Sequence, residues 1–273
     1  MNRLGLGERI GILLALTLLV AAVLLSLDPL PQDPGYHRFA DDRKLLGIPN
    51  LNDVVSNLAF VLVGALGLVR LFNGRLQAAF HAPSERRPYL LFFAALLLVG
   101  LGSTYYHLLP SNERLFWDRL PIATAFLALC AAVVADRIDA RAGNGWLLLL
   151  LTLSGGVALG YWIWSEWQGQ GDLRGYIFIQ FYPLLALPLI LWLFPRYRIC
   201  SAGHIGWIIF WYGVAKGLEL SDRQIYGLFG QILSGHTLKH LAAALAALVV
   251  LRMLQVAADG GKLPLTAKRN RHL

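Results

Sequence analysis

The segment IGILLALTLLVAAVLLSL, residues 10–27, is eighteen residues long and contains no charged side chain. A helix needs about 20 mostly apolar residues to cross the hydrocarbon core of a bilayer. No small-x-small cleavage motif follows the segment, and the next residues, DPLPQDP, are typical of a loop. The segment therefore predicts a retained membrane-spanning helix rather than a cleaved signal peptide.

The composition of the whole chain favours the same class of protein. Of 273 residues, 57% are hydrophobic and 15% are charged, whereas about 25% are charged in a typical soluble domain. The two cysteines, Cys130 and Cys200, are too few for a disulfide-rich scaffold. The net charge of +8 is spread between apolar stretches, so we expect no nucleic-acid partner. The composition indicates an integral membrane protein.

Eight segments are apolar enough to cross a membrane, and the expected fold is all-α, a polytopic membrane helix bundle. They are residues 10–27, 53–72, 89–109, 119–135, 146–164, 175–195, 205–219 and 236–256. The seventh is the least apolar because Lys216 and Glu219 interrupt it, so seven spans is the alternative. The long polar connection 28–52 is too short to be a domain, and we expect one membrane domain over residues 1–273.

Basic residues are distributed unequally between the two sides of this eight-span arrangement. With the N-terminus in the cytoplasm, the inner side carries a net charge of +10 and the outer side a net charge of −2. Lys and Arg concentrate on the cytoplasmic side of membrane proteins, so both ends are predicted to be cytoplasmic. The inner side includes a basic tail, residues 257–273, which suits contact with anionic headgroups.

Five polar residues gather at the predicted outer ends of three helices, and ionisable groups within spans are functional candidates because they are expensive to bury in lipid. In GLGSTYYHLLP, Ser103 and His107 are four residues apart and share one helix face. Asp118 opens the next helix in FWDRLP, and His236 and His240 are again four apart in SGHTLKH. The topology places all five at one depth near the outer face.

A histidine pair four residues apart on one helix is a common metal-binding arrangement. Together with His107, the pair His236 and His240 would supply three ligands, which leaves zinc one open position for water. Zinc lowers the pKa of such a water to about 7 and polarises a carbonyl. Asp118 can accept the proton of that water, and Ser103 can stabilise a developing oxyanion. Haem ligation is the alternative, but it leaves one histidine surplus and Asp118 without a role.

Other polar residues near the spans are interpreted as structural. Lys239 flanks the histidine pair and is expected to point away from its face, toward the membrane interface. A polar cluster expected to hold a structural ion pair comprises Lys216, Glu219 and Asp222. The remaining histidines lie outside the spans or at their edges and are expected to be packing or interfacial residues: His37, His81, His204 and His272.

The ordered set Ser103-x3-His107, Asp118 and His236-x3-His240 resembles the alkaline ceramidases, whose superfamily includes the adiponectin/progestin-type seven-helix receptors. The segments VVSNLAF, GLGSTYYH and WDRLPI are similar to the ceramidase branch, and FADDRKLLGIPN is similar to its bacterial members. The resemblance covers residues 36–256. It implies a seven-helix core, to which residues 10–27 add one N-terminal helix, in a bacterial inner (plasma) membrane.

The resemblance also implies an activity. In such enzymes three histidines hold a zinc ion, and an aspartate and a serine assist a bound water. By motif position, His107, His236 and His240 are the implied zinc ligands, and Asp118 and Ser103 are the implied catalytic residues. The implied reaction is hydrolysis of the amide of a ceramide or another N-acyl lipid, which gives a sphingoid base and a fatty acid. A lipid-binding receptor or sensor with a non-catalytic zinc site is the alternative.

Alkaline ceramidases also bind calcium through an acidic stretch before the helix that carries the VSN-like segment. The corresponding residues here are Asp41, Asp42, Asn50 and Asp53, whose oxygens suit Ca²⁺. The stretch is shorter than in the eukaryotic enzymes, and Asn50 stands where an acid is expected. Arg43 and Lys44 compete for the carboxylates, so a salt-bridged outer loop is the alternative to a calcium site.

Overall fold

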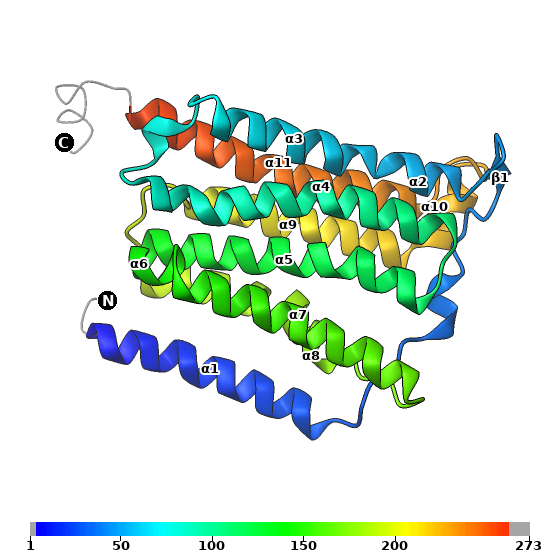
Figure 1. Ribbon diagram of the computed structural model, residues 1–273, viewed down its shortest axis with the longest axis horizontal. Helices are drawn as coiled ribbons and strands as arrows, with labels where there is room; N and C mark the ends of the chain where they lie inside the picture. The colour runs from blue at the N-terminus through cyan, green and yellow to red at the C-terminus, as the bar shows by residue number, and fades with distance from the viewer. Residues whose placement is uncertain (1–3, 262–273) are drawn as a thin grey trace.

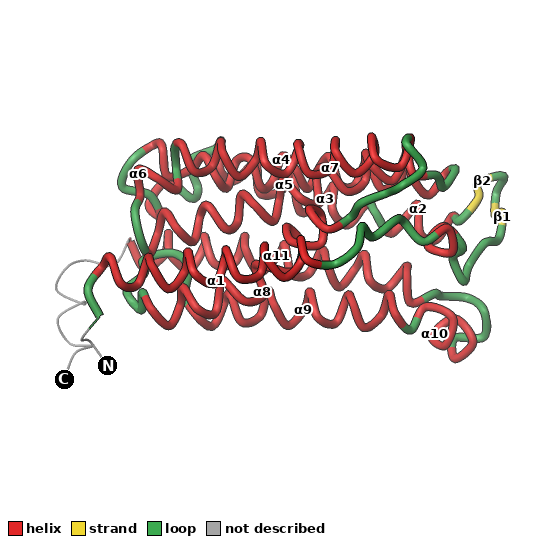
Figure 2. Tube along the Cα trace, turned by 90° about the horizontal axis from the view of Figure 1, so that it is seen from below, coloured by secondary structure: helices red, strands yellow, loops and turns green. Residues whose placement is uncertain are grey.

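The computed structural model describes residues 4–261 and is an all-α bundle of long helices that run side by side (Figures 1 and 2). The predicted fold class is thereby confirmed. The long helices are α1 (Leu6–Ser26), α3 (Leu58–Phe72), α4 (Arg87–Leu108), α5 (Asn112–Arg137), α7 (Trp146–Trp167), α8 (Arg174–Leu193), α9 (Ala202–Leu220) and α11 (Gly235–Gly261).

Short elements connect the long helices. Strands β1 (Lys44–Leu45) and β2 (Ile48–Pro49) form an antiparallel hairpin. The short helices are α2 (Leu51–Ser56), α6 (Ala140–Gly143) and α10 (Asp222–Leu228), and the 3-10 turns are η1 (Pro34–His37), η2 (Gln77–Ala79) and η3 (Pro83–Arg86).

Seven helical segments of the described chain are long and apolar enough to cross a membrane. They comprise α1, α2 with α3, η3 with α4, α5, α7, α8 and α11. Helix α9 is not among them, although it is 19 residues long and occupies the range expected for the seventh span. Lys216 and Glu219, in its last two turns, lower its hydropathy. Helices therefore occupy all eight expected ranges, and those in seven of the ranges are long and apolar enough to cross a membrane.

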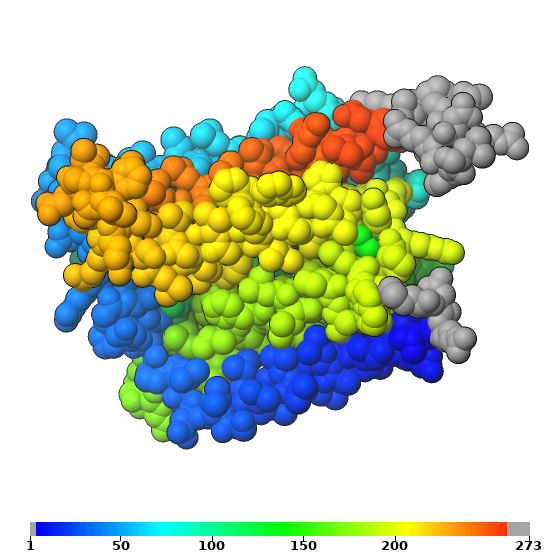
Figure 3. All heavy atoms as spheres, turned by 180° about the vertical axis from the view of Figure 1, so that it is seen from behind, coloured from blue at the N-terminus to red at the C-terminus, as the bar shows by residue number. Residues whose placement is uncertain are grey.

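Helices α4 and α5 form the centre of the bundle and pack against each other along their length. Helix α3 packs on α4, α7 packs on α5, and α11 packs between α9 and α3. Figure 3 shows the opposite face of the molecule, over which α8 and α9 lie next to each other. The core is mostly apolar and includes the fully buried Phe93, Leu115 and Val250.

Helix α1 lies at the edge of the bundle and packs on α8 (Figures 1 and 3). None of its residues, all of which are described, is buried. Two hydrogen bonds connect it to α8: one of 2.5 Å between the Thr17 and Tyr182 hydroxyls, and one of 3.1 Å from the Arg9 guanidinium to the Leu193 carbonyl. An apolar helix with so little buried surface faces lipid on most sides, as expected for a helix added to a complete core.

The described chain begins and ends at the same end of the bundle (Figure 1). At the opposite end lie the β1–β2 hairpin and α10 (Figure 2). We call this opposite end, which carries His107, Asp118 and His236, the site end. The expected basic tail at 257–273 begins in the last turns of α11, and residues 262–273 lie outside the described residues, as does His272.

Candidate metal centre

Three histidines meet at the site end of the bundle. His107 lies in the last turn of α4, and His236 and His240 lie in the first two turns of α11. One ring nitrogen of each lies within 4.8 Å of the other two, and all three side chains are buried. Within residues 4–261, this is the one group of three or more metal-ligating side chains. The structure therefore brings together the three ligands that the sequence predicted, in a group that could bind a metal ion.

The spacing of two of the ring nitrogens matches tetrahedral coordination. Nε2 of His107 and Nε2 of His236 are 3.3 Å apart. Two nitrogens that bind one tetrahedral zinc at about 2.0–2.1 Å are separated by about 3.3 Å, the edge of the tetrahedron. The distance between these two atoms therefore suits the binding of one ion.

His240 is oriented by a neighbouring serine. Its Nδ1 lies 2.7 Å from the Ser56 hydroxyl, which in turn donates to the Asp53 carbonyl at 3.0 Å. Because the Ser56 hydroxyl donates its proton to the carbonyl, it accepts a hydrogen bond from Nδ1–H of His240. The lone pair of Nε2 is then free. This chain fixes the tautomer that a metal ligand requires.

Two acidic residues fix the start of α11, where His236 and His240 lie. Asp222 accepts the backbone N–H of His236 at 2.8 Å with one carboxylate oxygen and that of Ala40 at 2.9 Å with the other. The buried Asp53 accepts the Thr237 hydroxyl at 2.6 Å. The first backbone N–H groups of a helix have no intrahelical partner, so Asp222 both satisfies one of them and holds His236 in place.

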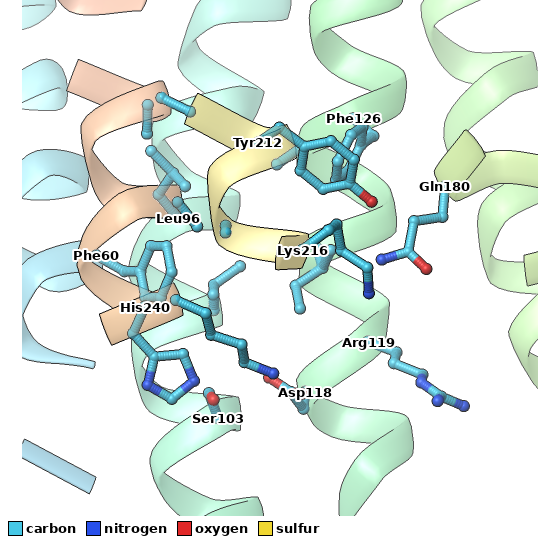
Figure 4. Close-up of a pocket in the computed structure, with 18 of the residues that line it drawn as sticks. Phe60, Leu96, Ser103, Asp118, Arg119, Phe126, Gln180, Tyr212, Lys216 and His240 are labelled. Atoms are coloured by element: carbon cyan, nitrogen blue, oxygen red, sulfur yellow. The ribbon is translucent and has the colours of Figure 1, made fainter. Parts of the chain in front are cut away.

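Ser103 and Asp118 lie beside the histidines because α4 and α5 approach closely there. A Cβ atom added to Gly102 would lie 2.2 Å from the carbonyl oxygen of Trp117, the residue before Asp118. Ser103, Asp118 and His240 line one cavity (Figure 4). Asp118 is buried, and its Oδ1 accepts no hydrogen bond within the described part of the chain. An acceptor of this kind is available to a substrate or a water.

The cavity has a volume of about 170 Å³ and lies between α4, α5, α8, α9 and α11. From Ser103 it follows α4 to Phe92, eleven residues or about 16 Å along the helix axis. The side chains over most of this length are apolar and include Leu96, Phe126 and Val250. Ser103, Asp118 and His240 lie together at one end, whereas Gln180 and Tyr212 lie further along, beside Phe126 (Figure 4). The cavity therefore has a polar end and a long, mostly apolar arm.

The prediction that Lys239 points toward the membrane interface is wrong. Its ammonium group lies 2.6 Å from Glu219, and its side chain lines the cavity. Glu219 also pairs with Lys216, so the expected structural ion pair is present and includes a second lysine. Asp222 is not part of this cluster, because it holds the start of α11. Lys239 faces inward because a buried carboxylate attracts its charge more strongly than the distant interface does.

The side chains predicted to bind calcium have different hydrogen-bond partners. Asp41 forms a salt bridge with Arg43 at 2.7 Å and accepts from Asn52 at 2.9 Å. Burial raises the pKa of Asp41, but the hydrogen bonds from Arg43 and Asn52 outweigh burial and hold it below its ordinary value. Asn50 donates to the His107 carbonyl at 2.8 Å, and Asp53 holds α11. Asp42 completes the predicted set and is largely exposed. These contacts agree with the alternative of a salt-bridged loop. Calcium binding stays a prediction.

Sequence reasoning missed three residues that shape the site. Ser56 lies in the segment VVSNLAF, whose resemblance to ceramidases marked the helix but not this hydroxyl. Asn50 was predicted only as a calcium ligand, and its hydrogen bond to the carbonyl of His107 was not foreseen. Arg119 follows Asp118 directly and lines the cavity. A charged residue inside an apolar span was the signal that could have identified Arg119.

No protein-family model, no curated protein and no solved structure matches the chain. What the site does is therefore to be inferred from its residues and their arrangement.

Proposed function

We propose that the protein is a zinc-dependent amide hydrolase of the membrane, similar to the alkaline ceramidases, that cleaves ceramide-like N-acyl lipids. One observation carries the proposal: three buried histidines converge, and one of them, His240, lines a cavity that also holds a buried Asp118 oxygen without a partner. Three ligands with a free position beside them are typical of catalytic zinc, whereas structural zinc is usually closed by four.

The donor set favours zinc over calcium and over haem. Imidazole nitrogens suit zinc, and calcium requires oxygen ligands. Two haem ligands bind iron from opposite faces of a porphyrin, and the 3.3 Å between the Nε2 atoms of His107 and His236 leaves no space for the ring. When bound by His107, His236 and His240, zinc supplies a water of lowered pKa and polarises the amide carbonyl.

The residues of the chain would act on the amide as follows. Asp118 accepts a proton from the attacking water through its unpartnered Oδ1 and later donates it to the leaving amine. The Ser103 hydroxyl, on the same cavity wall, donates to the oxyanion that develops on the acyl carbon. The Ser56 hydroxyl keeps the His240 ring in the required tautomer.

The shape of the cavity suits a lipid substrate. Its apolar arm runs about 16 Å along α4 into the helix bundle, a length and lining that suit part of an acyl chain. Its polar end is at the site end of the bundle, so the amide of a bound lipid would lie beside the histidines. The resemblance to ceramidases adds ceramide as the first substrate to try.

Metal content and fatty-acid release test the proposal. Protein purified in detergent without chelator should hold about one zinc per chain, and His236→Ala should lose it. His81→Ala, which changes an exposed histidine far from the cluster, is the control and should retain the metal. Asp118→Asn should keep the zinc and release fatty acid from ceramide about 10²- to 10⁴-fold more slowly than the wild type.

Three results would contradict the proposal. Metal-free wild-type protein would leave the histidines as packing residues. Full release of fatty acid by Asp118→Asn would remove the assigned proton acceptor. Zinc without any amide hydrolysis would favour a lipid receptor with a non-catalytic metal site.

A further inference from the structure

Arg119, a charged residue of the cavity, has no role in the reaction described above. Arg119 lies in α5 next to Asp118 and is buried, with 6% of its surface exposed. Its guanidinium carbon lies 5.3, 4.8 and 4.8 Å from the ring centroids of Tyr36, Trp162 and Tyr176. The arginine is therefore held in a cage of three aromatic rings.

The guanidinium of Arg119 has no carboxylate partner. Within residues 4–261, no ion pair within 4 Å includes it, and its Nη1 is buried without a hydrogen-bond acceptor. A guanidinium has five N–H donors and stays protonated in proteins. Aromatic rings attract the charge, but they do not accept hydrogen bonds from the N–H donors, which lie in the plane of the guanidinium. A buried charge that no carboxylate pairs with directly, in an apolar helix, is a candidate for a binding function.

Arg119 lines the same cavity as Asp118 and His240, on a different side of α5. In Figure 4, Asp118 points toward Ser103 and His240, whereas Arg119 lies on the side of Gln180. The cavity is lined by three basic side chains and two acidic ones. One acid, Glu219, is shared by Lys216 and Lys239, so positive charge is in excess where Arg119 lies.

We propose that Arg119 binds an oxyanion, a carboxylate or a phosphate, on the amine half of the lipid substrate. The acyl chain occupies the apolar arm along α4, the amide lies beside the histidines, and the charged end of the amine half reaches Arg119 and Gln180. This inference rests on the proposed amide hydrolysis for the orientation of the substrate. The favoured substrates are thus N-acyl lipids with an anionic headgroup.

The chemistry of the reaction is that of any amide hydrolysis. The C–N bond breaks, the hydroxyl of water joins the acyl carbon, and the proton of water joins the nitrogen. The products are a fatty acid and an amine that carries the anionic group. No oxidant or further reactant is required.

An oxyanion suits the site better than a neutral headgroup does. The planar fork of arginine donates two parallel hydrogen bonds to a carboxylate or a phosphate, and such charged bonds are about twice as strong as neutral ones. A neutral hydroxyl would accept one bond and leave the buried charge uncompensated.

Two pairs of lipids test the inference by direct binding. N-oleoylglycine and N-oleoylethanolamine share their chain and amide and differ by a carboxylate in place of a hydroxymethyl group. Ceramide 1-phosphate and ceramide form the corresponding phosphate pair. Affinities are measured on the full chain in the Asp118→Asn background, so that the lipids are not consumed. We expect the anionic member of at least one pair to bind about 10- to 100-fold more tightly, and the pair that shows it identifies the oxyanion.

Arg119→Gln should remove this preference. Arg119→Lys keeps the charge without the fork, should retain part of the preference, and serves if the glutamine variant does not fold. Arg114→Gln is the matched control, because Arg114 also stacks on a ring of the site end, Tyr105 at 4.2 Å, but is not part of the cavity. It should keep the full preference.

The outcomes separate the inference from the proposed hydrolysis. Equal affinity for both members of both pairs overturns the anion site even if the wild type releases fatty acid. A preference that stays at its full size in Arg119→Gln, or in Arg119→Lys if the glutamine variant does not fold, overturns it too. A preference that depends on Arg119 supports the anion site even if no fatty acid is released, and the absence of release then contradicts only the hydrolase.

Discussion

At the scale of single residues, the candidate metal centre depends on side chains that touch the histidines rather than on the histidines alone. Ser56 accepts from Nδ1 of His240 and donates to the Asp53 carbonyl. Asn50 holds the His107 carbonyl, and Asp222 holds the His236 backbone. Ring orientation sets where the lone pairs point, so these partners tune the affinity for a metal.

Ser56→Ala should weaken zinc binding about 10- to 100-fold, because His240 would lose the partner that fixes its tautomer. The measurement is competition with a chelator of known affinity. Ser154→Ala is the control, since Ser154 also bonds the carbonyl three residues before it, that of Leu151, but lies on α7 away from the histidines. Equal zinc affinity in Ser56→Ala and wild type would show that Ser56 does not orient the ligand.

At the scale of elements, the contact between α4 and α5 brings Ser103 beside Asp118. Gly102 allows this contact, because any side chain there would meet the Trp117 backbone. The backbone of α5 cannot yield as a flexible side chain would, so the two helices would have to separate.

Gly102→Ala should destabilise the protein by about 1–3 kcal/mol through overpacking and reduce fatty-acid release. Gly156→Ala provides the comparison, because outside the neighbouring backbone of its own helix no described atom lies within 4 Å of the added Cβ. That change should be neutral or stabilising by up to about 1 kcal/mol, since alanine favours a helix. Thermal unfolding in detergent measures both. An unchanged melting temperature in Gly102→Ala would contradict the close packing.

The connection between α1 and the rest of the bundle is held by an ion pair. Arg174 bonds Asp172 at 2.7 Å and also donates to the Leu27 carbonyl at 2.6 Å. The Leu173 backbone N–H donates to Leu30 at 2.8 Å. Burial raises the pKa of Asp172, but the hydrogen bonds from Arg174 outweigh burial and hold it below its ordinary value.

A carboxyl group with a lowered folded pKa stabilises the fold above its unfolded pKa, about 3.9 for an aspartate, and the contribution is lost as the pH falls through the folded value. Asp172→Asn should therefore be less stable than the wild type at pH 7 by roughly 1–3 kcal/mol. The difference should shrink below about pH 4. Melting temperatures of both proteins from pH 7 to pH 2 measure it. A difference that stays constant with pH would remove the ionic contribution of Asp172.

At the scale of the whole molecule, the bundle has two unlike ends. The described termini lie together at one end, and the candidate site lies at the other (Figure 1). The charge distribution of the sequence predicts that the end with the termini is cytoplasmic. The site would then open toward the outer face of the membrane.

Two cysteine variants test this orientation. Leu46→Cys lies in the hairpin turn of the site end, where the native side chain is 92% exposed. Arg75→Cys lies in the exposed turn after α3, at the other end. A membrane-impermeant thiol reagent should label Leu46→Cys in intact cells and Arg75→Cys only after permeabilisation. The reverse pattern would place the site in the cytoplasm. The wild-type protein, which carries the buried Cys200 and the half-buried Cys130 of α5, gives the background labelling.

The sequence by itself determined the membrane class, the eight helical ranges and the three metal-ligand candidates. Apolar length and helical periodicity are local properties, and a chain records them directly. The His236–His240 pair was predictable for the same reason, because a spacing of four fixes a shared helix face. His107 and Asp118 were assigned correctly to the same end because span counting fixes which helix ends share a membrane side.

Only the tertiary structure decided which side chains meet around that site. Ser56 reaches His240 across 184 positions of sequence, Lys239 turns inward to Glu219, and Arg119 lies among rings from three separate segments. No local pattern records such contacts, because they depend on the rotation of each helix about its axis. That rotation is set by close contacts such as Gly102 on Trp117, in which packing selects one arrangement from many that share the same apolar pattern.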